Sequence, residues 1–182
     1  MVDAPDITRR TIALVGLMGV GKSSVGRRLA SALSMPFVDA DAEIETAAGQ
    51  SISDIFTGLG EVEFRSGEHR VIKRIIEGPP AVLATGGGAF VHDGTRALLK
   101  ARAVTVWLQA DLDVLVDRAT RRDTRPLLRG KDPREVLERL AEARYPLYAL
   151  ADIHVMTGEA AHREAVRAVI AAVQDYYRRT AA

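Results

Sequence analysis

The stretch Gly16-Leu17-Met18-Gly19-Val20-Gly21-Lys22-Ser23 fits the pattern G-x-x-x-x-G-K-[ST] and follows a short apolar run at 11–15. It is interpreted as a phosphate-binding loop, because glycines let the backbone turn its N–H groups inward around a polyphosphate. In such a loop Lys22 contacts the β- and γ-phosphates, and the hydroxyl of Ser23 binds Mg²⁺. The sequence therefore predicts nucleotide contacts from Gly19, Val20, Gly21, Lys22, Ser23 and Ser24.

A glycine-rich turn with an exposed lysine is the alternative interpretation of this stretch. At average residue usage the pattern occurs by chance in a chain of this length roughly 1% of the time or less. The apolar run before it and the helical spacing of Val25, Leu29 and Leu33 after it favour the strand, loop and helix of a nucleotide site.

The composition limits the remaining possibilities. A chain of 182 residues with 47% hydrophobic content suits a single domain over 1–182. Lys and Arg number 25 against 24 Asp and Glu, so no overall field draws the chain to nucleic acid or to an anionic membrane. The absence of cysteine excludes disulfides and thiolate chemistry and agrees with a reducing compartment. We expect a cytoplasmic protein, and with no obvious exposed apolar stripe we expect a monomer.

Short β-like runs alternate with longer amphipathic stretches, which is typical of an α/β fold with a parallel sheet covered by helices on both faces. Strands are expected near 12–15, 37–39, 81–84, 104–108 and 153–156. Helices are expected near 22–33, 42–48, 51–56, 60–77, 94–100, 112–120, 133–145 and 159–178. Helix caps are expected at Ser51, Asp93, Asp111 and Asp132.

The segment 118–131 holds six basic residues and one acid, Asp123. On a phosphate-binding fold such a segment is typical of a flap that closes over the transferring phosphoryl group, where arginine stabilises charge. A solvated charged loop is the alternative. We expect a lid over about 118–132.

Two further motifs follow expected strands, and in open α/β sheets ligands bind beyond the carboxyl ends of the strands. Asp39 and Asp41 follow the second strand, and in extended backbone both carboxylates would share a face. One would serve a hydrated Mg²⁺ ion and the other would hold or deprotonate a substrate hydroxyl. The alternative is that Asp41 caps the following helix and Asp39 only ends the strand. The third strand ends in Thr85 rather than an acid, so Asp39 is the better metal candidate.

Gly86, Gly87 and Gly88 follow the third strand. Three successive glycines are costly to order unless the backbone must approach something closely, and a ligand is the expected reason. A plain flexible turn is the alternative.

Arginines supply the remaining candidates. Arg65 and Glu68 lie three residues apart on one expected helix face. A mere surface ion pair is one interpretation of this pair, and a role in the site is the other. Arg144 is expected at a helix end broken by Pro146, where it would satisfy terminal carbonyls or pair with a substrate carboxylate.

Together these motifs resemble those of shikimate kinases. The resemblance covers the phosphate loop and Asp39-Ala40-Asp41, then the segments 49–56, 60–68, 86–89, 125–128 and 144–148, in that order. It implies the fold of small nucleoside-monophosphate-kinase-like enzymes, with a five-stranded parallel sheet of order 2-3-1-4-5. It also implies transfer of the γ-phosphoryl group of ATP to the 3-hydroxyl of shikimate, in aromatic amino-acid biosynthesis.

The resemblance also implies roles for individual residues. Asp41 would bind shikimate hydroxyls and assist their deprotonation, Arg65 and Arg144 would pair with the carboxylate, and Gly86 to Gly88 would line the same pocket, within a substrate-binding region of about 40–77. Lys22 and Arg125 would act on the γ-phosphate. Arg118 would stack on adenine, and Ser23 and Asp39 would hold Mg²⁺.

The chain departs from the family pattern at 157–162, where family members often carry Arg and Pro and this sequence has neither. The sequence therefore does not indicate which residues contact the adenine base on that side. Another small-molecule kinase of the same fold, such as a gluconate or nucleoside-monophosphate kinase, is the nearest alternative function. A GTPase switch would need N-K-x-D and D-x-x-G motifs, and the chain has no asparagine and no D-x-x-G.

Overall fold

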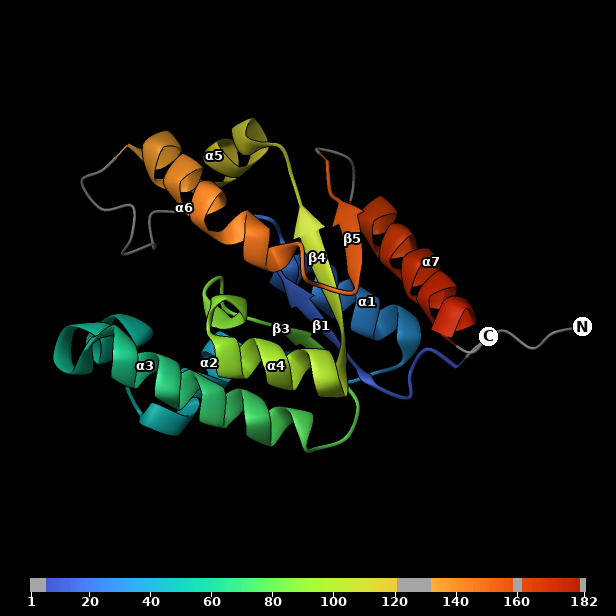
Figure 1. The fold of residues 1–182 in the computed structure, drawn as a ribbon, viewed down its shortest axis with the longest axis horizontal. Coiled ribbons are helices and arrows are strands. Elements are labelled where there is room, and N and C mark those ends of the chain that lie inside the picture. Colours follow the sequence, from blue (N-terminus) through green and yellow to red (C-terminus); the bar gives the residue numbers. More distant parts are fainter. Residues whose placement is uncertain (1–5, 121–131, 159–161, 181–182) are drawn as a thin grey trace, which may run out of the picture.

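The computed structural model describes residues 6–120, 132–158 and 162–180 as seven α-helices, five strands and one 3-10 helix (Figure 1). The strands are β1 (Thr11–Val15), β2 (Phe37–Asp39), β3 (Val82–Ala84), β4 (Ala103–Gln109) and β5 (Ile153–Met156). The helices are α1 (Lys22–Leu33), α2 (Ala40–Ala48), α3 (Ile52–Ile76), α4 (Asp93–Arg102), α5 (Leu112–Thr120), α6 (Pro133–Tyr148) and α7 (His162–Thr180). The 3-10 helix is η1 (Ala89–Val91).

The sheet is parallel, with the order β2-β3-β1-β4-β5, which confirms the expected fold class and strand order. β1 lies in the centre, where Leu14 pairs with Ala84 of β3 and with Val106 of β4. All five residues of β1 are buried, as a strand covered on both faces requires. Because the strands are parallel, the loops after β1, β2 and β3 all leave the same edge of the sheet.

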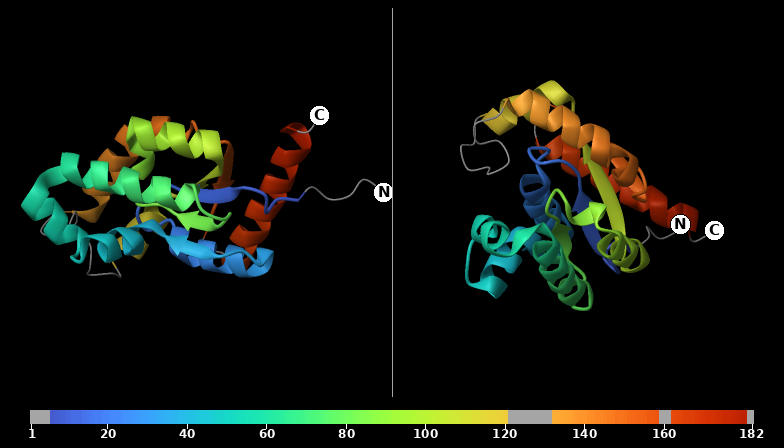
Figure 2. Two further views of the ribbon diagram at one scale, coloured as in Figure 1. Left: turned by 90° about the horizontal axis from the view of Figure 1, so that it is seen from below. Right: turned by 60° about the vertical axis from the view of Figure 1, so that its left-hand side comes forward.

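Helices cover both faces of the sheet (Figure 2). α1 carries the chain from β1 toward β2, whereas α4 carries it from β3 back to β4 in the opposite direction. Right-handed crossovers then place these two helices on opposite faces. α1 packs with α7, and α4 packs with α3 and β4. In the part of the chain that the structure describes, no helix is long and apolar enough to cross a membrane.

The two helices expected at 51–56 and 60–77 are confirmed as the two segments of α3, which meet at a kink at Gly60, whose φ of 80° and ψ of 175° are not helical. Other expected helix boundaries were wrong. α6 does not end before Pro146 but continues through it to Tyr148. Ser51 and Asp132 cap their helices as expected, but α4 is capped by His92 rather than Asp93.

Gly26 lets α1 approach the sheet closely. A Cβ atom built on it would lie 2.7 Å from Cε2 of Phe37 and 3.3 Å from Cδ1 of Leu14. We expect Gly26→Ala to lower the free energy of unfolding by about 1 kcal/mol or more, because overpacking outweighs the gain in helix propensity. Urea denaturation measures the change.

Gly58 in α3 is the matched control, because a Cβ atom there meets no atom within 4 Å. Gly58→Ala is expected to leave the free energy of unfolding unchanged or to raise it by up to about 1 kcal/mol. Equal effects of the two substitutions would contradict the close packing assigned to Gly26.

Candidate active site

The loop between β1 and α1 has the backbone geometry of a phosphate cradle. Gly16, Gly19 and Gly21 have φ angles of 140°, 84° and 98°, a range that favours glycine. Gly21 precedes α1 with no side-chain cap, and the first turn of α1 contains no acidic residue. The N–H groups at this helix start therefore suit an anion.

Lys22 and Ser23 lie where the loop meets the ends of β1 and β2. The Lys22 Nζ atom donates to the carbonyls of Gly16 at 2.7 Å and Leu17 at 3.0 Å, so the side chain folds back over the loop. Ser23 Oγ donates to Oδ2 of Asp39 at 2.7 Å. A hydroxyl and a carboxylate are brought together here, and these are oxygen ligands of the kind that Mg²⁺ prefers.

Asp39 and Asp41 do not share a strand face as expected. β2 ends at Asp39, which caps α2 by accepting from the backbone N–H of Asp41 at 3.1 Å, and Asp41 lies in the first turn of that helix. The surrounding protein raises the pKa of Asp41 by desolvation and Asp39 raises it further, while Lys22 and Arg65 oppose the shift. The side chain keeps access to solvent. Asp41 is thus a carboxylate at the open mouth of a charged site.

The three glycines after β3 approach three sets of charged groups. A Cβ atom on Gly86 would lie 2.7 Å from Oδ1 of Asp41 and 3.0 Å from Oε1 of Glu68. One on Gly88 would collide with the guanidinium of Arg65. The turn therefore brings α2 and α3 to one point.

Gly87, in the middle, faces the phosphate loop and α6. A Cβ atom there would lie 3.4 Å from Nη1 of Arg144, 3.7 Å from the backbone N of Met18 and 3.8 Å from the carbonyl O of Gly16. Arg144 and the phosphate loop thus meet at this glycine. The structure brings together the candidate residues of the loop, Asp41, Arg65, Arg144 and the triple glycine.

Arg65 is held by a buried partner. Its Nη1 atom lies 2.6 Å from Oε2 of Glu68, whose side chain is only 1% exposed. The pKa of Glu68 is raised by burial, and Arg65 opposes that shift. The guanidinium also lies over the rings of Phe64 and Phe56, at 5.0 and 5.9 Å from their centroids. The pair is therefore not the surface ion pair that its spacing alone suggested.

Glu68 was missed as a site residue, although it belongs to the motif that carries Arg65. Its Oε1 atom is buried and has no hydrogen-bond partner among the described residues. The same atom faces Gly86, next to Asp41. Residue spacing indicates which groups share a helix face, but not that the face is buried.

Arg118 lies against the phosphate loop on the side of β5. Its guanidinium donates to the carbonyls of Gly19 at 3.4 Å, Val20 at 3.3 Å and Gly158 at 2.9 Å. It connects the phosphate loop to the segment after β5. Arg125 and most of the expected lid lie outside the described residues.

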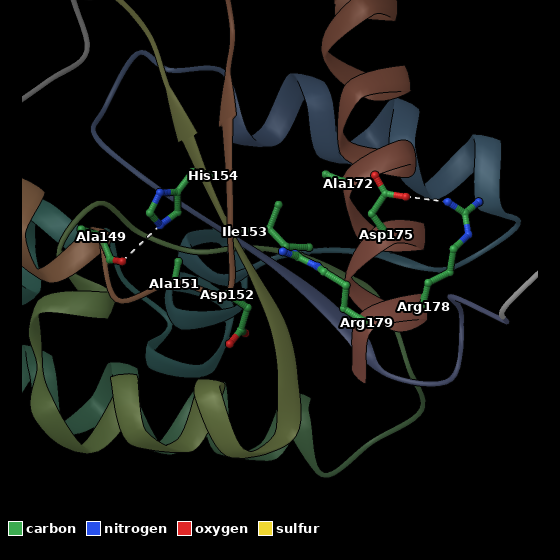
Figure 3. Close-up of a pocket in the computed structure, with 9 residues that line it drawn as sticks. All are labelled: Ala149, Ala151, Asp152, Ile153, His154, Ala172, Asp175, Arg178 and Arg179. Atoms are coloured by element: carbon green, nitrogen blue, oxygen red, sulfur yellow. Dashed lines mark hydrogen bonds and ion pairs between the residues drawn. The ribbon is translucent and has the colours of Figure 1, made fainter. Parts of the chain in front are cut away.

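A hollow of about 740 Å³ lies elsewhere, where β5 begins and α7 ends (Figure 3). Several of its polar groups bond within the protein: Asp175 pairs with Arg178 at 2.5 Å, and Asp152 accepts from Thr105. β5 starts at the edge of the sheet opposite the phosphate loop. Nine residues line this hollow, all within the described part of the chain, and none of them is a candidate site residue.

The fold and the site together define a P-loop phosphotransferase that acts on a small molecule. A family model described as "Shikimate kinase" matches residues 18–174. A shikimate kinase of Caulobacter vibrioides is 60% identical over 172 residues, covering 94% of this chain and 86% of that protein. One of Zymomonas mobilis is 54% identical over 164 residues, covering 90% and 93%. The chain belongs to the shikimate kinase family, whose members transfer a phosphoryl group from ATP to shikimate.

Solved structures agree with this family. Shikimate kinase from Acinetobacter baumannii in complex with shikimate has a TM-score of 0.85 and 38% identity, covering 91% of this chain and 95% of that one. A gluconokinase from Sinorhizobium meliloti has a TM-score of 0.60 at 20% identity, so it shares the fold alone. The family assignment replaces the alternative of a gluconate or nucleoside-monophosphate kinase.

The buried ion pair between Glu68 and Arg65 can be tested by mutation. We expect Glu68→Ala to lower the free energy of unfolding by about 3 kcal/mol, because it leaves the Arg65 charge largely buried without its main partner. The exposed pair Glu43–Arg74, 3.0 Å apart, is the matched control. Glu43→Ala should lower the free energy of unfolding by under about 1 kcal/mol. Equal losses in urea denaturation would contradict the buried pair.

Proposed function

We propose that this site performs the family reaction with Mg²⁺, and that the two substrates meet across the triple glycine. The observation that carries the proposal is the approach of Gly86, Gly87 and Gly88 to Asp41, Arg144 and Arg65, with the phosphate loop touching Gly87. Acceptor groups and nucleotide groups thus adjoin one short turn. That arrangement supports direct transfer between two bound substrates.

The nucleotide side of the proposal rests on the loop and the start of α1. The N–H groups of Gly19, Val20, Gly21, Ser23 and Ser24 would cradle the phosphates, as the left-handed glycines and the uncapped helix start favour. Lys22 would move from its loop carbonyls to the β- and γ-phosphates. Arg118 would contact the nucleotide from the side of Gly158. Arg125 is proposed for the γ-phosphate on the family pattern alone.

Magnesium would be held by Ser23 directly and by Asp39 through water. The oxygen pair fits, because Ser23 Oγ and Asp39 Oδ2 lie 2.7 Å apart beside the phosphate loop. The structure shows no group of three or more acidic, histidine or cysteine side chains that could bind a metal within 6–120, 132–158 and 162–180. Phosphate oxygens and water would complete such a shell, and the ion would offset the phosphate charge.

The acceptor side is charged to suit a hydroxylated acid. Arg65 lies at Gly88 and Arg144 at Gly87, and together they would supply two guanidinium groups for one carboxylate. Asp41, at the Gly86 end, would accept a hydrogen bond from the 3-hydroxyl. The carboxylate and the reacting hydroxyl of shikimate would then be fixed at separate points.

The proton of that hydroxyl would pass to Asp41 during transfer. The new bond forms between the hydroxyl oxygen and the γ-phosphorus, the bond from that phosphorus to the β,γ-bridging oxygen breaks, and ADP leaves with the electron pair. A raised pKa suits Asp41 to this role, because a base works best when its pKa lies closer to the working pH. Lys22 would stabilise charge on the transferring group.

We also infer a single domain acting as a monomer in the cytoplasm, with the acceptor held by the region of about 40–77 and a lid of about 118–132. The strongly exposed large apolar side chains of the described chain support a monomer, because they do not form one continuous stripe: Leu59, Val62, Leu150 and Met156 come from different segments. Leu59 and Val62 flank the kink of α3, whereas Leu150 and Met156 lie near β5.

Asp41→Asn tests the proton transfer. The amide keeps the shape of the side chain but cannot take the proton, so we expect kcat to fall by about 100-fold or more while ATP binding is kept. Coupled measurement of ADP release gives kcat, and calorimetric titration gives ATP affinity. Asp175→Asn, on α7 at the far hollow, is the control and should leave both unchanged. Near-normal turnover of Asp41→Asn would remove Asp41 from the chemistry.

Arg65→Ala tests the carboxylate site. We expect the KM of shikimate to rise by about 10- to 100-fold, while the KM of ATP changes far less. This rise corresponds to the binding free energy that hydrogen bonds to a charged group contribute. Arg74→Ala removes an exposed arginine from the same helix and is the control. An equal rise in both KM values would assign Arg65 a purely structural role.

A further inference from the structure

We propose that Tyr148 is a positioning residue for the acceptor site, where its hydroxyl fixes the Gly87 carbonyl and the guanidinium of Arg144 relative to each other. The inference rests on the role of Arg144 in the proposed function. Tyr148 contributes no charge to the site. It acts through its two neighbours, so loss of its hydroxyl should weaken binding of the acceptor rather than binding of ATP.

The first contact is with the triple glycine. The hydroxyl of Tyr148 donates to the carbonyl of Gly87. On either side, the Gly86 carbonyl accepts from the N–H of Ala89 and the Gly88 carbonyl accepts from the N–H of Val91, each at 3.1 Å. The flanking carbonyls are therefore fixed by the local turn. The middle carbonyl is tied instead to α6, 61 residues further along the chain.

The second contact is with Arg144, one helical turn before Tyr148. Residues four apart on a helix share a face, and both side chains lie at Gly87. Burial raises the pKa of Tyr148, while Arg144 opposes the shift through its charge and a side-chain hydrogen bond. A hydroxyl has one proton to donate and lone pairs to accept with, so Tyr148 can serve both neighbours at once.

The ring of Tyr148 is held rigidly enough to position these groups. It is fully buried, and its centroid lies 5.9 Å from that of Trp107 in β4. Trp107 in turn packs against Tyr145 of α6 and His154 of β5, each at 5.2 Å. The hydroxyl therefore projects from the end of α6, where the ring packs against the central sheet, into the turn. It couples the core to the point where Arg144 meets the phosphate loop.

Tyr148→Phe tests the proposal, because it removes the hydroxyl and keeps the ring. We expect the KM of shikimate to rise about 3- to 10-fold, the value of one hydrogen bond, with the KM of ATP changed by less than about twofold. Calorimetric titration with shikimate measures its affinity independently of turnover. That titration should show the same weakening as the KM.

Tyr177→Phe is the matched control. Its hydroxyl is also buried, lies on α7 and has no hydrogen-bond partner among the described residues. Losing it should leave both KM values unchanged. If Tyr148→Phe leaves the KM of shikimate unchanged, or raises both KM values equally, the proposal is overturned.

A double-mutant cycle separates this inference from the function on which it rests. In an Arg144→Ala background, adding Tyr148→Phe should change the KM of shikimate by less than about twofold, because the group to be positioned is gone. Additive effects would overturn the positioning role while leaving Arg144 in the acceptor site. An Arg144→Ala enzyme with an unchanged KM for shikimate would instead contradict the proposed function.

Discussion

The site depends on the backbone of Gly86, Gly87 and Gly88 having no side chains. Charged groups from α2, α3 and α6 and the phosphate loop all approach this turn, and Cβ atoms on Gly86 and Gly88 would occupy the space of Asp41 and Arg65. Glycine loses more conformational entropy on folding than any other residue. The turn offsets that loss through hydrogen bonds from Ala89, Val91 and Tyr148. A flexible segment is thereby converted into a fixed point between the groups proposed to hold the two substrates.

Two separately packed parts of the molecule meet at this point. The phosphate loop extends from the main core, whose centre is β1. Asp41 and Arg65 lie on helices that share a smaller apolar cluster, formed by Ile44, Ile55 and Phe64. The kink at Gly60 folds α3 so that both of its segments reach this cluster. The groups proposed to hold the acceptor are thus supported by a different apolar cluster from the groups proposed to hold the nucleotide. The turn after β3 brings the two sets next to each other.

The fold and much of the candidate site could be predicted from the sequence because their signals are local or follow strand ends. The loop at 16–23 carries its own pattern, and Asp41 and the triple glycine come directly after strands of one parallel sheet. The reason given for Asp41 was nevertheless wrong, since α2 begins at Ala40 and Asp41 is helical. The position of Asp41 after a strand was predictable. The backbone conformation that orients it was not, because it depends on the helix cap that Asp39 forms.

Residues whose role depends on burial or on tertiary contact were missed. Glu68 has the spacing of an ordinary surface pair, and only the packing of α3 against the turn makes its carboxylate buried. Tyr148 was missed because a proline normally ends a helix, whereas α6 continues through Pro146. That continuation keeps Arg144 and Tyr148 one turn apart on the same helix, where both lie at Gly87. A local rule therefore failed where the site needs an unusual backbone.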